Sequence, residues 1–128
     1  MTPQARRIAY WIFTLLFLIP MAGSGIPELL FGGAAQSAPT IIHLGYPLYL
    51  LRILGLAKML GAIAILARGS RRLTEWAYAG YVFDLVGATA SHLFAGDGAF
   101  ALVPMALLVC VAASLHLAVV RDTGEVAA

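Results

Sequence analysis

The chain has 128 residues, of which 62% are apolar and only 11% are charged, and its mean hydropathy is +0.92. A typical soluble domain has about 25% charged residues, so the composition excludes a soluble globular enzyme and a disordered tail. The net charge of +2 is too small for a nucleic-acid binder of the usual basic kind, and the composition predicts an integral membrane protein.

Four apolar stretches are each long enough to cross a hydrocarbon core of about 30 Å, which takes roughly 20 helical residues. They are continuous and lack the alternation of a barrel strand. We therefore predict an all-α membrane protein with four transmembrane helices, over about 8–25, 47–67, 76–94 and 100–120. Pro47 suits the first turn of the second helix. The first stretch could also be a signal peptide, because Arg6 and Arg7 precede it and small residues follow it.

The cations indicate how these helices are oriented. Six of the eight Lys and Arg residues lie at the helix ends on one side of an antiparallel bundle: Arg6, Arg7, Arg68, Arg71, Arg72 and Arg121. By the positive-inside rule, both termini and the connection at 68–72 are cytoplasmic, and the connections at 26–45 and 96–99 face outward. The expected architecture is an antiparallel four-helix bundle. Its interfacial aromatic residues are predicted to be Trp11, Tyr46, Tyr49, Trp76 and Tyr78.

Ionisable residues inside the spans are costly and rarely face lipid. Lys58 lies nine residues before Ala67, and Asp84 lies nine residues after Glu75, so both are about 13 Å from the cytoplasmic ends of their helices. Because these helices are antiparallel neighbours, we predict that Lys58 and Asp84 interact. The pair is either a structural ion pair or part of a site that handles protons or a ligand.

A second polar layer is predicted nearer the outer face. Arg52, Ser91 and His92 lie about 24 Å from the cytoplasmic boundary by the same count. A guanidinium beside an imidazole suits an anionic group or a quinone oxygen, because both accept hydrogen bonds from fixed donors. Together with Lys58 and Asp84, these residues form the candidate ligand site. In the alternative interpretation, Arg52 extends to the outer headgroups and His92 is structural.

Small residues predict where the helices approach one another. One face of the third helix carries small and polar residues at helical spacing: Gly80, Asp84, Gly87 and Ser91. Small residues allow close backbone contact in membranes, so we expect this face to point into the bundle. Gly55 and Gly61 of the second helix offer a surface opposite it.

Other kinds of site find less support in the sequence. Cys110 is the single cysteine, so it cannot form an internal disulfide, a redox pair or a cysteine-based zinc site. His92 and His116 lie at opposite ends of the predicted bundle and cannot both ligate one haem. No motif predicts haem, flavin or metal. A metal site at the outer mouth would have suitable residues without a tight motif spacing: Glu28, His43, His92 and Asp97.

The sequence blocks around these residues resemble the DoxX-like family. They are LGYPLY at 44–49, LGLAKMLG at 54–61, EWAYAG at 75–80, Phe83-Asp84, Gly87-Ala88 and Ser91-His92, and RIAYW at 7–11 resembles the family's opening. The resemblance implies a single domain, 1–128, in a small bacterial membrane protein with four helices. The family takes its name from a relative in a thiosulfate:quinone oxidoreductase, and other relatives are linked to thiol or oxidative stress or to membrane-protein assembly. The resemblance assigns no catalytic role to Lys58, Asp84 or His92.

The resemblance and the polar residues together predict a redox- or quinone-associated accessory subunit of the inner (plasma) membrane. A quinone is the candidate ligand. A membrane redox subunit and a second copy of the chain are candidate partners within the lipid bilayer, and no nucleic acid is expected. The alternative is a structural or assembly factor for other membrane proteins, without catalysis of its own. A proton or small-solute pathway ranks third, because four helices form a thin wall.

Overall fold

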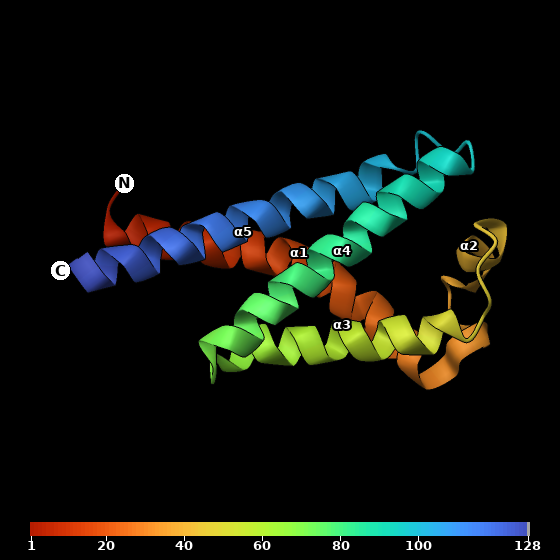
Figure 1. The fold of residues 1–128 in the computed structure, drawn as a ribbon, viewed down its shortest axis with the longest axis horizontal. Coiled ribbons are helices and arrows are strands. Elements are labelled where there is room, and N and C mark those ends of the chain that lie inside the picture. Colours follow the sequence, from red (N-terminus) through yellow and green to blue (C-terminus); the bar gives the residue numbers. More distant parts are fainter. Residues whose placement is uncertain (128) are drawn as a thin grey trace.

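The structure, a computed structural model, describes residues 1–127, with the side chains of residues 1–119. Over this range it is all-helical (Figure 1), as predicted. The long helices are α1 (Pro3–Phe31), α3 (Leu50–Ala67), α4 (Arg71–Phe94) and α5 (Leu102–Ala127), and the 3₁₀ helix η1 (Gly32–Ala34) and the short helix α2 (Ala38–His43) connect α1 to α3. The side chain of Arg121, one of the cations used to predict the topology, lies outside the described residues.

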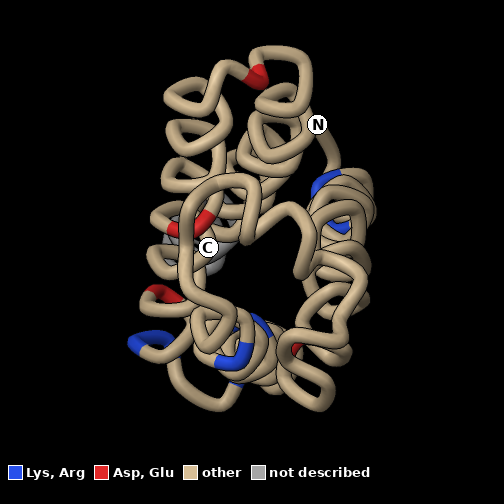
Figure 2. Tube along the Cα trace, turned by 90° about the vertical axis from the view of Figure 1, so that its right-hand side faces the viewer, with Lys and Arg blue, Asp and Glu red and all other residues tan. Residues whose placement is uncertain are grey.

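Within the described residues, three helical segments are long and apolar enough to cross a membrane: Pro3–Ala34, Leu50–Ala67 and Leu102–Val119. They correspond to the first, second and fourth predicted spans. The third predicted span lies in α4, whose 24 residues extend about 36 Å. Its hydropathy is lower because it contains charged residues: Arg71, Arg72, Glu75 and Asp84. Elsewhere charged residues are sparse along the trace (Figure 2), and the chain has the helices of a multi-pass membrane protein.

Several helix boundaries differ from those predicted, and two of them lie on either side of the α1–α3 connection. α1 continues beyond residue 25 to Phe31, so Glu28 belongs to this helix and not to the connection that follows. The helix ends at Gly32, whose φ of +54° is a conformation that glycine adopts without steric cost. α3 begins at Leu50, so Pro47 precedes the helix and is not in its first turn as predicted. Pro47 belongs to the preceding turn, in which its carbonyl accepts a hydrogen bond from the Leu50 N–H over 3.1 Å.

The long helices contact one another in a ring, in the order α1, α3, α4 and α5. Both termini and the α3–α4 turn lie at the same end of the molecule, on the left in Figure 1. At this end the guanidinium of Arg68 lies over the rings of Trp11 and Tyr10, 4.8 and 5.1 Å from their centroids. This cation–π contact joins the α3–α4 turn to α1. The opposite end carries the α1–α3 connection and the α4–α5 turn.

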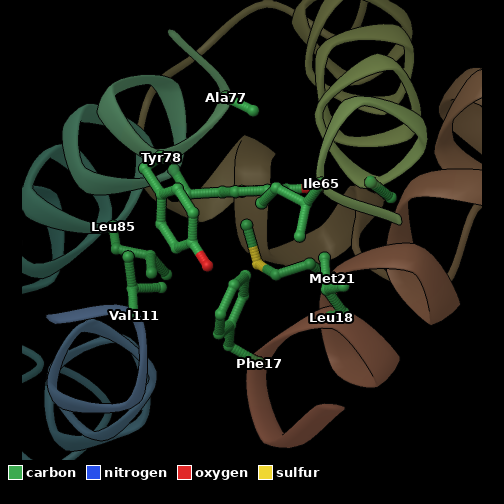
Figure 3. Close-up of a cluster of buried hydrophobic side chains, with 10 residues drawn as sticks. Phe17, Leu18, Met21, Ile65, Ala77, Tyr78, Leu85 and Val111 are labelled. Atoms are coloured by element: carbon green, nitrogen blue, oxygen red, sulfur yellow. The ribbon is translucent and has the colours of Figure 1, made fainter. Parts of the chain in front are cut away.

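The apolar core lies where the long helices converge (Figure 3). All four contribute to it, with side chains that include Phe17, Leu18, Met21, Ile65, Tyr78, Leu85 and Val111. Tyr78 is only 2% exposed, so the prediction that it is interfacial is wrong: α4 begins at Arg71, which places Tyr78 two turns inside the helix. Its hydroxyl lies 2.7 Å from Ser114 Oγ, which lies 2.6 Å from Thr14 Oγ1. This buried network joins α4, α5 and α1.

Candidate functional site between α3 and α4

The position of the candidate site depends on a close approach between α1 and α3. A Cβ built on Gly55 would lie 2.5 Å from the Leu29 nitrogen and 2.7 Å from the Gly25 carbonyl oxygen. A Cβ built on Gly25 would lie 2.9 Å from Lys58 Cβ. Because neither position has room for a side chain, the two backbones come together here, and Lys58 of α3 is brought against the last turns of α1.

Lys58 forms a buried ion pair with Glu28, and not with Asp84 as the sequence predicted. The Lys58 ammonium donates to Glu28 Oε2 over 2.9 Å, to Glu28 Oε1 over 3.1 Å and to Ser24 Oγ over 3.1 Å. Glu28 Oε1 also accepts a hydrogen bond from Ser37 Oγ over 2.8 Å. The side chains of Lys58 and Glu28 are 12% and 4% exposed. Each charge therefore has its partner within the α1–α3 contact.

The sequence suggested Glu28 only as a metal ligand at the outer mouth, and its contact with Lys58 was not predicted. The first span was predicted to end near Gly25, which placed Glu28 in an outward-facing connection. The stretch IPELLF at 26–31 is nevertheless mostly apolar, and this was the available signal that the helix continues. One turn separates Ser24 from Glu28, so both face Lys58 from the same side of α1.

Asp84 lies on the other side of Lys58, in a groove between α3 and α4. The groove has a volume of about 630 Å³, and the residues that line it include Lys58, Trp76, Gly80, Tyr81, Phe83 and Asp84. Asp84 interacts electrostatically with Lys58, but no hydrogen bond or ion pair joins them among the described residues. The Tyr81 hydroxyl donates to the backbone carbonyl of Lys58 over 2.6 Å and ties α4 to α3 across the base of this region.

The small-residue face of α4 does not point into the bundle, contrary to the prediction. The buried residues of α4 are Ala77, Tyr78, Tyr81 and Leu85, whereas Gly80 and Gly87 are exposed and a Cβ built on either would meet no other atom within 4 Å. The bulky aromatic and aliphatic side chains bury more apolar area than glycine does, so they decide which face is turned inward. Of the two glycines of α3, Gly61 does face α4, against the Tyr81 ring, whereas Gly55 faces α1.

The three residues of the predicted outer layer have separate surroundings. Arg52 is exposed at the start of α3, with Nε 2.7 Å from a Cβ built on Gly32. Ser91 Oγ lies 2.7 Å from the Tyr46 hydroxyl. No hydrogen bond or ion pair joins Arg52 to Ser91 or His92 in the described part of the chain, and the start of α3 lies apart from the end of α4 in Figure 1.

His92 belongs to a different polar cluster, at the C-terminal end of α4. Asp97 Oδ2 lies 2.7 Å from His43 Nε2 and 3.5 Å from His92 Nδ1. His92 Nδ1 is buried and makes no hydrogen bond. The cluster includes His43, His92 and Asp97 of the metal ligands considered from the sequence, but Glu28 is bound to Lys58 instead. Over the described residues, no group of three or more potential ligands has the arrangement of a metal site.

A family model described as the DoxX-like family matches residues 12–114. The matched range contains Glu28 together with all the candidate ligand residues: Arg52, Lys58, Asp84, Ser91 and His92. No curated protein and no solved structure matches the chain.

Proposed function

Because the chain belongs to the DoxX-like family, we propose that it is a redox- or quinone-associated accessory subunit of the inner membrane. In this proposal α4 also crosses the membrane, as the third of four spans, both termini are cytoplasmic and the lipid-soluble ligand occupies the groove between α3 and α4. The three apolar helical segments support the membrane setting. The shared location of the termini and the α3–α4 turn supports an even number of crossings (Figure 1).

The observation that carries the proposal is the groove itself. Its volume of about 630 Å³ is within the range of ligand pockets, roughly 300–1,000 Å³. Trp76 and Phe83 on its wall are 67% and 76% exposed, so in a bilayer they would face lipid. An aromatic ring dissolved in the membrane can therefore reach this wall from the side and stack on it.

An accessory role agrees with the chemistry of the chain. Cys110 is its single thiol, so an internal dithiol–disulfide exchange has no second sulfur. Electrons for a quinone would therefore pass through a partner subunit or a bound cofactor. Lys58 and Asp84 would set the polarity at the inner wall of the groove.

The experiment uses two matched glycine variants of α4. Gly80 lines the groove and Gly87 does not, yet a Cβ on either has open space around it. The wild-type protein and the Gly80→Leu and Gly87→Leu variants are purified from native membranes, and quinone in the lipid extract is quantified together with copurifying proteins. We expect quinone with wild type and Gly87→Leu and its loss with Gly80→Leu. Quinone at equal levels in all three preparations would contradict the groove as its site.

The same preparations test the alternative role as a structural or assembly factor. In that case one membrane protein copurifies with all three preparations, and none of them retains quinone above the level of the bulk lipid. That result would replace the proposed redox association, because the chain would then act through its protein contacts alone.

A further inference from the structure

In and behind the groove between α3 and α4, the acidic residues outnumber the basic ones. Three ionisable residues lie at it or directly behind it: Glu28, Lys58 and Asp84. The Lys58 ammonium has three N–H donors, and Ser24 and the two oxygens of Glu28 accept them. The Glu28–Lys58 pair is therefore neutral as a unit, and the ammonium has no donor left for a groove ligand.

Asp84 interacts with Lys58 only electrostatically. Its side chain lines the groove, and within the described residues it makes no hydrogen bond and no ion pair. Counted as ionised groups, two carboxylates and one ammonium give this set a formal charge of −1. An unpaired carboxylate at membrane depth is costly, and Coulomb attraction to a cation strengthens as the local dielectric constant falls.

The aromatic walls of the groove also favour a cationic ligand. Trp76, Tyr81 and Phe83 line it beside Asp84, and aromatic ring faces attract cations by their quadrupole. A bare metal ion is disfavoured because Asp84 offers a single carboxyl group and hard cations require several oxygen ligands. A large organic cation needs only one countercharge and an apolar surface, and this groove supplies both.

We propose that the groove binds a lipophilic organic cation, such as a substituted ammonium or phosphonium, with its charge beside Asp84 and its apolar groups against Trp76 and Phe83. The inference takes the ligand position from the proposed function and goes beyond it, because a quinone carries no positive charge. It also follows from the pairing of Lys58 with Glu28: had Lys58 paired with Asp84, the carboxylate that lines the groove would already have a cation beside it.

The test compares two probes of the same shape and opposite charge. Tetraphenylphosphonium and tetraphenylborate are titrated against the full chain in nanodiscs of phosphatidylcholine, with empty nanodiscs as the blank. We expect saturable binding of tetraphenylphosphonium and none of tetraphenylborate. Asp84→Asn is expected to weaken phosphonium binding by roughly tenfold or more, because it removes the charge partner, and Asp84→Glu is expected to retain it. Glu75→Gln serves as the control, since Glu75 is an exposed carboxylate of the same helix, paired with Arg71.

Either of two results would overturn the inference. One is equal binding of the two probes, and the other is an affinity of Asp84→Asn for tetraphenylphosphonium equal to that of the wild-type protein. If Asp84→Asn does not fold, Gly80→Leu takes its place, because it fills the groove with the carboxylate intact and should abolish phosphonium binding. Retained binding in that variant would also refute the site. Quinone in native extracts without phosphonium binding would overturn this inference and leave the proposed function standing. Phosphonium binding that depends on Asp84, without native quinone, would do the reverse.

Discussion

Methionine substitutions at Glu28 and Lys58 test whether the buried ion pair holds α1 against α3. Methionine has a volume close to that of either residue, so Glu28→Met and Lys58→Met remove a charge without leaving a large cavity. Each single change leaves the other charge buried without its partner, since the two side chains are only 4% and 12% exposed. The double variant replaces the pair with two apolar residues in contact, and we expect it to recover most of the lost stability.

The structure indicates the size of the effect. The shortest contact between the two groups is 2.9 Å, and breaking a buried pair of this kind costs about 3–5 kcal/mol. A loss of about 3 kcal/mol corresponds to a change of roughly 150-fold in the folding equilibrium. The exposed pair Arg71–Glu75 is a matched control with an N–O distance of 3.2 Å. Its side chains are 73% and 60% exposed, and its coupling should be only about 0.3–0.5 kcal/mol.

The free energy of unfolding is measured in mixed detergent micelles by circular dichroism. It is measured for two double-mutant cycles, one for Lys58 and Glu28 and one for Arg71 and Glu75. A third cycle combines Lys58→Met with Asp84→Asn. We expect a large coupling for Lys58 with Glu28 and a smaller one for Lys58 with Asp84, because no hydrogen bond or ion pair joins the latter two among the described residues. If Lys58 couples more strongly with Asp84 than with Glu28, the pairing described above is wrong.

Three further predictions concern packing and topology. Gly55→Ala should destabilise the protein by about 1–3 kcal/mol, because its Cβ would lie 2.5 Å from the Leu29 nitrogen, whereas Gly87→Ala should be neutral; equal thermal stability of the two variants would contradict the close α1–α3 approach. Ser114→Val should cost about 1–3 kcal/mol because Tyr78 loses the shorter of its two buried hydrogen bonds, the one of 2.7 Å to Ser114, and keeps the one of 3.4 Å to Tyr10; an unchanged unfolding temperature would argue against the network. Reporter fusions at the C-terminus and at 96–99 should report the cytoplasm and the outside, respectively; a C-terminus on the outside would exclude the four-span topology.

The class of protein follows from the sequence alone, because composition and the lengths of apolar runs are properties of the whole chain. Three of the four predicted spans coincide with helical segments apolar enough to cross a membrane. The break at 69–70 also follows from local chemistry, since Ser70 caps α4 by accepting a hydrogen bond from the Leu73 N–H. The family resemblance is confirmed over residues 12–114.

The pairing of the charged residues could not be predicted from the sequence, because it depends on how the helices pack. Counting residues placed Lys58 and Asp84 at similar depth, but depth does not specify the direction in which a side chain leaves its helix. Gly25 and Gly55 bring α1 close to α3, and this contact places the Glu28 carboxylate within hydrogen-bond reach of Lys58. In the same way, burial of Tyr78, Tyr81 and Leu85 turns the glycine face of α4 outward. Pairing depends on helix rotation and separation, which are set by all the side chains in contact.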